Sequence, residues 1–235
     1  MSRQETSTAD RPSIRFDGLT GLRWWAAFVV FLYHLQVFAP LPGPLATVFA
    51  QGYRGVTFFF VLSGFVLTWS FSSRVSKSTF YWRRFARIFP SHAVAWIIAV
   101  PVFYVLIPGT GVDWLKPVDP GVLTLSFLLL QGWWLVPAIL FAGNPAAWTL
   151  TCEAFFYAFH PFAQWALRRV KCVGALAAGT AVLLGAFAVR AAALLWPDSG
   201  FAHLPPPVRH APEFIIGMCI AWALRSGWRP RVPVL

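Results

Sequence analysis

The stretch Leu22 to Phe38, LRWWAAFVVFLYHLQVF, has the length and apolar composition of a helix that crosses a membrane. It carries two ionisable residues, Arg23 near its start and His34 about two-thirds of the way along. The eleven-residue spacing is about three helical turns, which places both side chains on one face, roughly 16 Å apart along the axis. Because an ionisable group in a membrane usually faces a cavity or a partner, this stripe indicates a lined path.

The composition of the whole chain predicts an all-α membrane protein. Of its 235 residues, 58% are hydrophobic and only 11% are charged, whereas soluble domains are about a quarter charged. Several apolar runs approach bilayer length, which favours a polytopic transmembrane helix bundle with six or seven spans. Beyond the first run, they lie at about 56–71, 91–107, 121–141, 148–167, 172–196 and 208–224.

The net charge of +11 fits a membrane protein better than a nucleic-acid-binding one, because the basic residues cluster between apolar runs. Such clusters are typical of cytoplasmic loops, and the strongest lies between residues 72 and 90. We therefore expect a multi-pass protein of the plasma (inner) membrane with its N-terminus in the cytoplasm. The three cysteines lack metal-ligand spacing and read as small buried hydrophobes, so no metal is expected.

The run at 121–141 decides the topology. If it crosses the bilayer fully, the two later basic clusters fall outside. If it enters and returns, every basic cluster falls inside, as the loop-charge rule favours. Gln131, Gly132 and Pro137 make such a re-entrant path physically reasonable. It would also bring Glu153 to the same depth in the bilayer as His34.

Two side chains are candidates for proton chemistry. His34 is either a general base or a histidine at a helix end bonded to a carbonyl. Glu153, within the apolar run WTLTCEAFFYAF, is either a carboxylate that orients such a base or one half of a structural ion pair with an arginine. Tyr157 and His160 fall on its helical face and are further possible partners.

A third feature is the run of residues 80–90, FYWRRFARIFP. In a helix Arg83 and Arg87 are one turn apart with Arg84 alongside, a patch of the size of a phosphate group. The alternatives are an orientation signal or a contact with lipid headgroups.

Four blocks of this sequence, in this order, resemble the acyltransferase-3 family of integral membrane O-acyltransferases. They are LTGLRWWAAFVVFLYH, GYRGVTFFFVLSGFVLTWSF, FYWRRFARIFPSH and NPAAWTLTCEAFFYAFHPF, followed by a weaker fifth, PEFIIGMCIAW. Together they span residues 19–222. The opening block is similar to the actinobacterial branch that includes macrolide and other antibiotic acyltransferases.

The resemblance implies transfer of an acyl group, often acetyl, from acyl-CoA to a hydroxyl of a glycan, lipid or antibiotic, without a metal. By position, His34 would be the base and Glu153 the acidic residue of its block. Arg23 would line the donor path, and coenzyme A phosphates would bind Arg83, Arg84 and Arg87. The partners implied are acyl-CoA, the hydroxylated acceptor and the lipid bilayer, with no nucleic acid.

Residues 1–15 are polar and rich in Ser, Thr and Arg, so we expect a disordered cytoplasmic segment there. The resemblance implies an acyltransferase-3-like transmembrane domain at 16–235. This domain is expected to be C-terminally incomplete, because family domains usually have about ten spans. Thr149 stands where the family commonly has serine, a change that keeps the hydroxyl.

Two other functions fit the same residues. A proton-coupled transporter also uses broken helices, a histidine near the midplane and a buried carboxylate. A non-catalytic membrane partner would need none of these groups for chemistry.

Overall fold

The computed structural model describes residues 17–36, 39, 42–105 and 115–230. The segment expected to be disordered, 1–15, lies outside the described residues. The described chain is mostly helical, with one two-residue strand pair, which agrees with the all-α class. It divides into two compact units, Met1–Gly55 and Val56–Leu235, and each is described by itself.

The first unit is built on α1 (Asp17–Leu35), the helix predicted from the opening stretch. After it come α2 (Gly43–Ala50) and the short 3-10 helix η1 (Gln51–Tyr53). Glycines let this return path lie against α1: a Cβ at Gly52 would collide with the carbonyl oxygen of Val29. α1 therefore holds Arg23 and His34 on one continuous helix, as the sequence predicts.

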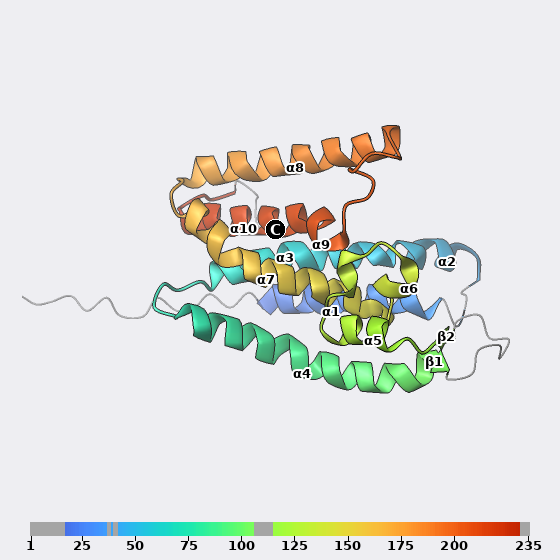
Figure 1. Cartoon of the computed structure of the whole chain (residues 1–235). Helices are drawn as coiled ribbons and strands as arrows, with labels where there is room; N and C mark the ends of the chain where they lie inside the picture. Colours follow the sequence, from blue (N-terminus) through green and yellow to red (C-terminus); the bar gives the residue numbers. More distant parts are fainter. Residues whose placement is uncertain (1–16, 37–38, 40–41, 106–114, 231–235) are drawn as a thin grey trace, which may run out of the picture. The chain divides into compact units, whose positions relative to one another are not determined.

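Long helices form the frame of the second unit (Figure 1). They are α3 (Arg54–Trp69), which starts at the unit boundary, α4 (Lys77–Phe103), α7 (Trp148–Leu167), α8 (Cys172–Leu195) and α10 (Ala211–Arg225).

The core of this unit is aromatic. Phe156 packs edge-on against Phe60, with ring centroids 5.1 Å apart, and stacks on Phe214 at 4.8 Å. All three rings are fully buried, together with Met218. Burying rings of this size supplies much of the apolar packing that joins α3, α7 and α10.

α3 and α10 approach each other backbone to backbone. A Cβ at Gly64 would collide with the carbonyl oxygen of Phe214, and one at Gly217 would collide with that of Val61. Small residues that allow such contact are the common means of association between membrane helices.

Three described helical segments are long and apolar enough to cross a membrane: Gly43–Trp69, Lys77–Phe103 and Cys172–Leu195. The six or seven spans expected from composition are therefore not confirmed. α10 has 15 residues, about 22 Å of helix, which is less than the roughly 30 Å of a hydrocarbon core. α7 carries Glu153, His160 and Gln164 along its length, which lowers its apolar character.

α8 presents an apolar surface that suits lipid. Leu184, Phe187 and Leu194 are 62%, 64% and 82% exposed, and the helix has no charged residue before Arg190. Soluble monomeric proteins rarely expose apolar side chains to this extent. Together with the spanning segments, this surface identifies a membrane protein.

The run at 121–141 forms no helix of spanning length among its described residues. It is broken into short pieces, with a left-handed residue at Leu129 (φ 58°). Thr151 donates a buried hydrogen bond of 3.3 Å to Gln131, which ties the run to the start of α7. The pieces, with the flanking η3, are α5 (Pro120–Phe127), η2 (Gln131–Trp133), α6 (Pro137–Leu140) and η3 (Pro145–Ala147).

The remaining elements are small. β1 (Tyr104–Val105) and β2 (Lys116–Pro117) form a two-residue parallel pair in which Tyr104 is opposite Lys116. The single-turn α9 (Pro206–Arg209) precedes α10 and packs against α7.

The end of α3 is capped by a side chain from α10. The Arg225 guanidinium donates through Nη1 to the carbonyl oxygens of Thr68, Trp69 and Phe71, at 2.7, 3.0 and 3.0 Å. The Thr68 and Trp69 carbonyls belong to the last turn of α3, where intrahelical donors run out, and a cation there also complements the helix dipole. Arg225 thereby fixes the loop 70–76 that follows α3.

We expect Gly64→Ala and Gly217→Ala each to lower the free energy of unfolding, by about 1–3 kcal/mol, because the added methyl group must push the α3 and α10 backbones apart. The measurement is thermal unfolding in detergent, followed through the reactivity of the buried Cys152 and Cys219 thiols. Gly185→Ala on α8, where a Cβ meets nothing within 4 Å, is the control and should not destabilise. Equal unfolding temperatures of all three variants would contradict the close contact between α3 and α10.

Arg225→Gln should loosen the loop without unfolding the bundle, because it removes charge-assisted hydrogen bonds worth about 1.5–3 kcal/mol in sum. Hydrogen exchange should accelerate at residues 68–76 and stay unchanged in the core of α7. The matched control is Arg229→Gln, a cation at the same end whose Nη1 contacts only Leu224 and Trp228. Unchanged exchange in the Arg225 variant would show that the cap does not order the loop.

Candidate active site

His34 is held in one tautomer by its own helix. Its Nδ1 lies 2.8 Å from the carbonyl oxygen of Val30, and a carbonyl only accepts, so Nδ1 carries the hydrogen. In the neutral ring Nε2 then keeps its lone pair, and no described residue hydrogen-bonds to it. The carbonyl contact expected of a purely structural histidine is thus present, and it leaves the ring in the form that a general base requires.

Glu153 lies half-buried on α7, as the sequence predicts for its block. The Tyr157 hydroxyl, one turn further along, donates to Glu153 Oε2 at 3.3 Å. This confirms Tyr157 as a partner of the carboxylate. His160, the other residue on that face, places its Nε2 3.3 Å from Thr68 Oγ1 and stacks on Phe80.

The arginine patch is helical, as expected, because α4 begins before it. Ser76 caps the helix by accepting from the Thr79 N–H at 3.1 Å. Arg83 and Arg87 are exposed, whereas Arg84 is half-buried. The Arg84 guanidinium lies 5.6 Å from the Phe80 ring and 5.8 Å from the Tyr157 ring, and its Nε is buried with no hydrogen-bond partner among the described residues.

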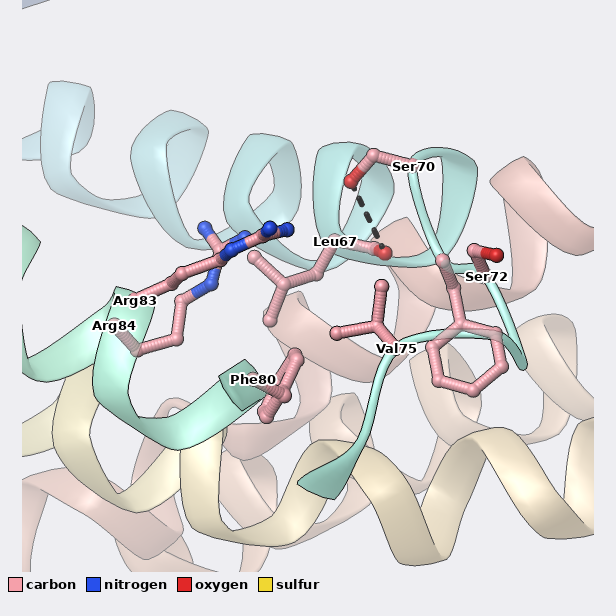
Figure 2. Close-up of a pocket in the computed structure, with 8 residues that line it drawn as sticks. Leu67, Ser70, Ser72, Val75, Phe80, Arg83 and Arg84 are labelled. Atoms are coloured by element: carbon pink, nitrogen blue, oxygen red, sulfur yellow. Dashed lines mark hydrogen bonds between the residues drawn. The ribbon is translucent and has the colours of Figure 1, made fainter. Parts of the chain in front are cut away.

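Arg83 and Arg84 line one small pocket of about 60 Å³ (Figure 2). Figure 2 shows both side chains leaving α4 toward the end of α3, with Phe80 and Val75 on the other side of the pocket. Ser70 and Ser72, from the loop that follows α3, add hydroxyl groups to its lining. The Ser70 hydroxyl donates to the Val66 carbonyl oxygen at 2.7 Å, so the two guanidiniums are the groups that make this pocket suitable for an anionic oxygen group.

Glu153 and the arginine patch are connected through Tyr157. The tyrosine hydroxyl binds the carboxylate, its ring faces Arg84, and the charges of Arg84 and Arg87 both act on its hydroxyl. The structure therefore brings together Glu153 and Tyr157 of α7 and Arg84 of α4, all of them predicted from the sequence. Arg23 and His34 share α1, which belongs to the other unit.

Two wider hollows adjoin this pocket, at the end of the unit where α3, α7 and α10 finish and α4 begins (Figure 1). One, of about 450 Å³, is lined by Arg74, Arg168 and Arg225. The other, of about 550 Å³, has Lys77 and Arg168 in its lining. Phe71 lines all three, so the capped loop is their shared wall. None of the described residues that line them is acidic.

Sequence reasoning missed a second acid–base pair. At the start of α10, His210 Nδ1 lies 3.3 Å from Glu213 Oε1, which also accepts from Arg190 at 3.3 Å. The His210 ring packs against Trp148 and Phe60. Glu213 is inside the weakest of the five blocks. It follows His210 by three residues, a spacing that places two side chains side by side on a helix and could have predicted this pair.

The described residues contain no group of three or more His, Cys, Asp or Glu side chains that could hold a metal ion.

Comparisons with known proteins match most of this chain. The family model described as an acyltransferase domain matches residues 16–231. Acyltransferase MdmB of Streptomyces mycarofaciens is 35% identical over 92% of the chain and 59% of its own length. Protein 2 in the picA locus of Rhizobium radiobacter is 34% identical over 75% of the chain and 97% of its own length. Nodulation protein 10 of Rhizobium leguminosarum bv. viciae is 32% identical over 69% of the chain.

The chain spans about three fifths of the Streptomyces acyltransferase and about half, 48%, of the nodulation protein. The comparison with solved structures gave no match. The family model covers nearly the whole described chain and contains the α1, α4 and α7 residues described above. This protein therefore belongs to the acyltransferase-3 family.

Proposed function

We propose that this protein is a membrane-embedded O-acyltransferase that moves an acyl group, most simply acetyl, from cytoplasmic acyl-CoA to a hydroxyl group. The acceptor classes are a glycan, a lipid or an antibiotic-type small molecule. The observation that carries the proposal is the pocket lined by both Arg83 and Arg84, within a chain of this family. Such a pocket suits the diphosphate of coenzyme A, and Arg87 lies one turn further on.

The donor side of the proposal follows from charge. The hollows beside the pocket are lined by further cations and by no acid among the described residues. A polyanionic thioester would be attracted to this end of the protein, and the cytoplasm is where acyl-CoA is found. We therefore assign the basic end to the cytoplasm in a multi-pass protein of the plasma (inner) membrane, with the N-terminus on the same side.

The chemical step is assigned to His34. Its Nε2 takes the proton of the acceptor hydroxyl as that oxygen attacks the thioester carbonyl. The C–S bond then breaks, the imidazolium returns the proton to the departing thiolate, and the products are an ester and free CoA. The Val30 carbonyl supports this role because it holds the tautomer in which Nε2 can accept.

Arg23 and Glu153 have supporting roles in this proposal. Arg23, three turns before His34 on α1, lines the path of the donor. Glu153 supplies the carboxylate that balances the positive charge formed on the base, with Tyr157 holding one of its oxygens.

The choice of acceptor rests on the first sequence block, which resembles the actinobacterial branch of antibiotic acyltransferases. The similarity to the Streptomyces acyltransferase covers 92% of this chain, which supports an actinobacterial type of enzyme. We propose a hydroxylated small molecule as the first acceptor to test, ahead of a glycan or lipid.

Replacing His34 by Ala should lower the rate of acyl transfer by about 10²–10⁴-fold and leave CoA binding unchanged, because the base acts on the acceptor. The measurement is thiol release from acetyl-CoA by membranes that contain the protein, paired with equilibrium binding of CoA. His203→Ala, at an exposed histidine, is the control. Full turnover in the His34 variant would remove this residue as the base.

Arg83→Gln combined with Arg84→Gln should raise the KM for the acyl-CoA donor at least tenfold and change the KM for the acceptor little, because the guanidiniums bind only the donor phosphates. Arg229→Gln removes a charge at the same end without lining the pocket and should leave both constants unchanged. An unaltered donor KM would return the patch to the role of an orientation signal.

A further inference from the structure

Beside the Arg83–Arg84 pocket lies a groove of about 550 Å³ between the start of α4 and the second half of α7. Its volume falls within the range of about 300–1,000 Å³ that is common for ligand sites. Phe71, Val75 and Phe80 line both the groove and the pocket, so one ligand can extend from one to the other. We call this the α4–α7 groove.

The walls of the α4–α7 groove are flat and aromatic. Tyr81 of α4 faces α7, where its hydroxyl donates to the carbonyl oxygen of Ala158 at 3.4 Å. Phe162 and Trp165 of α7 are 68% and 60% exposed, and the Arg169 guanidinium covers one face of the Trp165 ring at 3.4 Å from its centroid, which leaves the other face for a ligand. Exposed rings from both helices suit a planar heterocycle, because every nucleobase has a face that stacks on an aromatic ring.

The rim of the groove is cationic on both sides. Lys77 is at the first turn of α4, and Arg168 directly follows α7. The Arg168 guanidinium also lies 6.0 Å from the Phe71 ring, on the shared wall. A ligand that places an anionic group here would be bound from two helices, and none of the described lining residues is acidic.

The side-chain amide of Gln164 is the feature of the groove that can distinguish one base from another. It lines the groove, it is 1% exposed, and both its amide oxygen and its amide nitrogen are buried without a hydrogen-bond partner among the described residues. A buried amide left unpartnered on both atoms is costly, so it favours a ligand that donates and accepts at adjacent positions. The edge of adenine that carries N6 and N7 is such a group, and glutamine amides pair with it in two hydrogen bonds.

We propose that the α4–α7 groove binds the adenosine 3′-phosphate end of the acyl-CoA donor. The adenine lies between Tyr81 and Trp165 with its N6 and N7 edge on the Gln164 amide, and Lys77 with Arg168 binds the 3′-phosphate. The diphosphate then lies on Arg83 and Arg84. This inference rests on the proposed function, because it specifies how the same donor is held.

The test is equilibrium binding to the protein purified in neutral detergent, with three probes: CoA, dephospho-CoA and adenosine 3′,5′-bisphosphate. The wild type should bind CoA at least tenfold more tightly than dephospho-CoA, and should bind the bisphosphate, which has no thioester arm. Arg168→Gln should abolish the preference for CoA over dephospho-CoA. Lys171→Gln, which removes a nearby charge outside the groove lining, should keep it.

Gln164→Leu tests the base contact. It should weaken binding of the bisphosphate about tenfold while leaving the melting temperature unchanged or higher, because it removes an unpartnered amide from the interior. An unchanged affinity for the bisphosphate in both the Arg168 and the Gln164 variants overturns the groove assignment.

The outcomes separate this inference from the proposed function. If CoA binds and only the Arg83 and Arg84 substitutions weaken it, the donor assignment stands and the groove assignment is wrong. If no probe binds and anionic lipid alone protects the groove from labelling at a cysteine placed at Ser73, both are wrong and the groove is a headgroup site.

Discussion

The backbone contact between α3 and α10 determines how the basic end of this protein is built. Two glycines that face each other's carbonyls let the helices touch, and the fully buried rings of α3, α7 and α10 fill the space beside the crossing. Because the helices are so close, Arg225 at the end of α10 reaches the last carbonyls of α3. The loop that it fixes is the common wall of the three hollows in which we place the donor.

Charge and solvent explain why this end is suited to a nucleotide. In the bilayer a cation is costly, so arginines and lysines collect where the helices end and water begins. Here they come from α4, α7, α10 and the loop before α4, and they surround concave, partly aromatic surfaces. The same distribution that sets the orientation of a membrane protein thus also creates a site for a polyanion. The family membership of the chain is what favours the proposed enzyme over a transporter.

The local features of the site were predictable from the sequence, because helical periodicity alone places them. This holds for Arg23 and His34 on α1, for the helical arginine patch and for Tyr157 beside Glu153. Features that depend on the approach of distant helices were not predictable, among them the cap by Arg225, the buried Gln164 amide and the pair of His210 with Glu213. The predicted number of spans is not confirmed, because an apolar run looks the same in sequence whether it faces lipid or, like much of α10, the protein interior.

The most direct test of the central claim is the fate of a labelled acyl group. Membranes that contain the protein are incubated with acetyl-CoA labelled in the acetyl group and with hydroxylated acceptors, and the products are analysed by mass. The account predicts one labelled ester formed for each CoA thiol released. Movement of an acceptor across the membrane with the thioester left intact would contradict it.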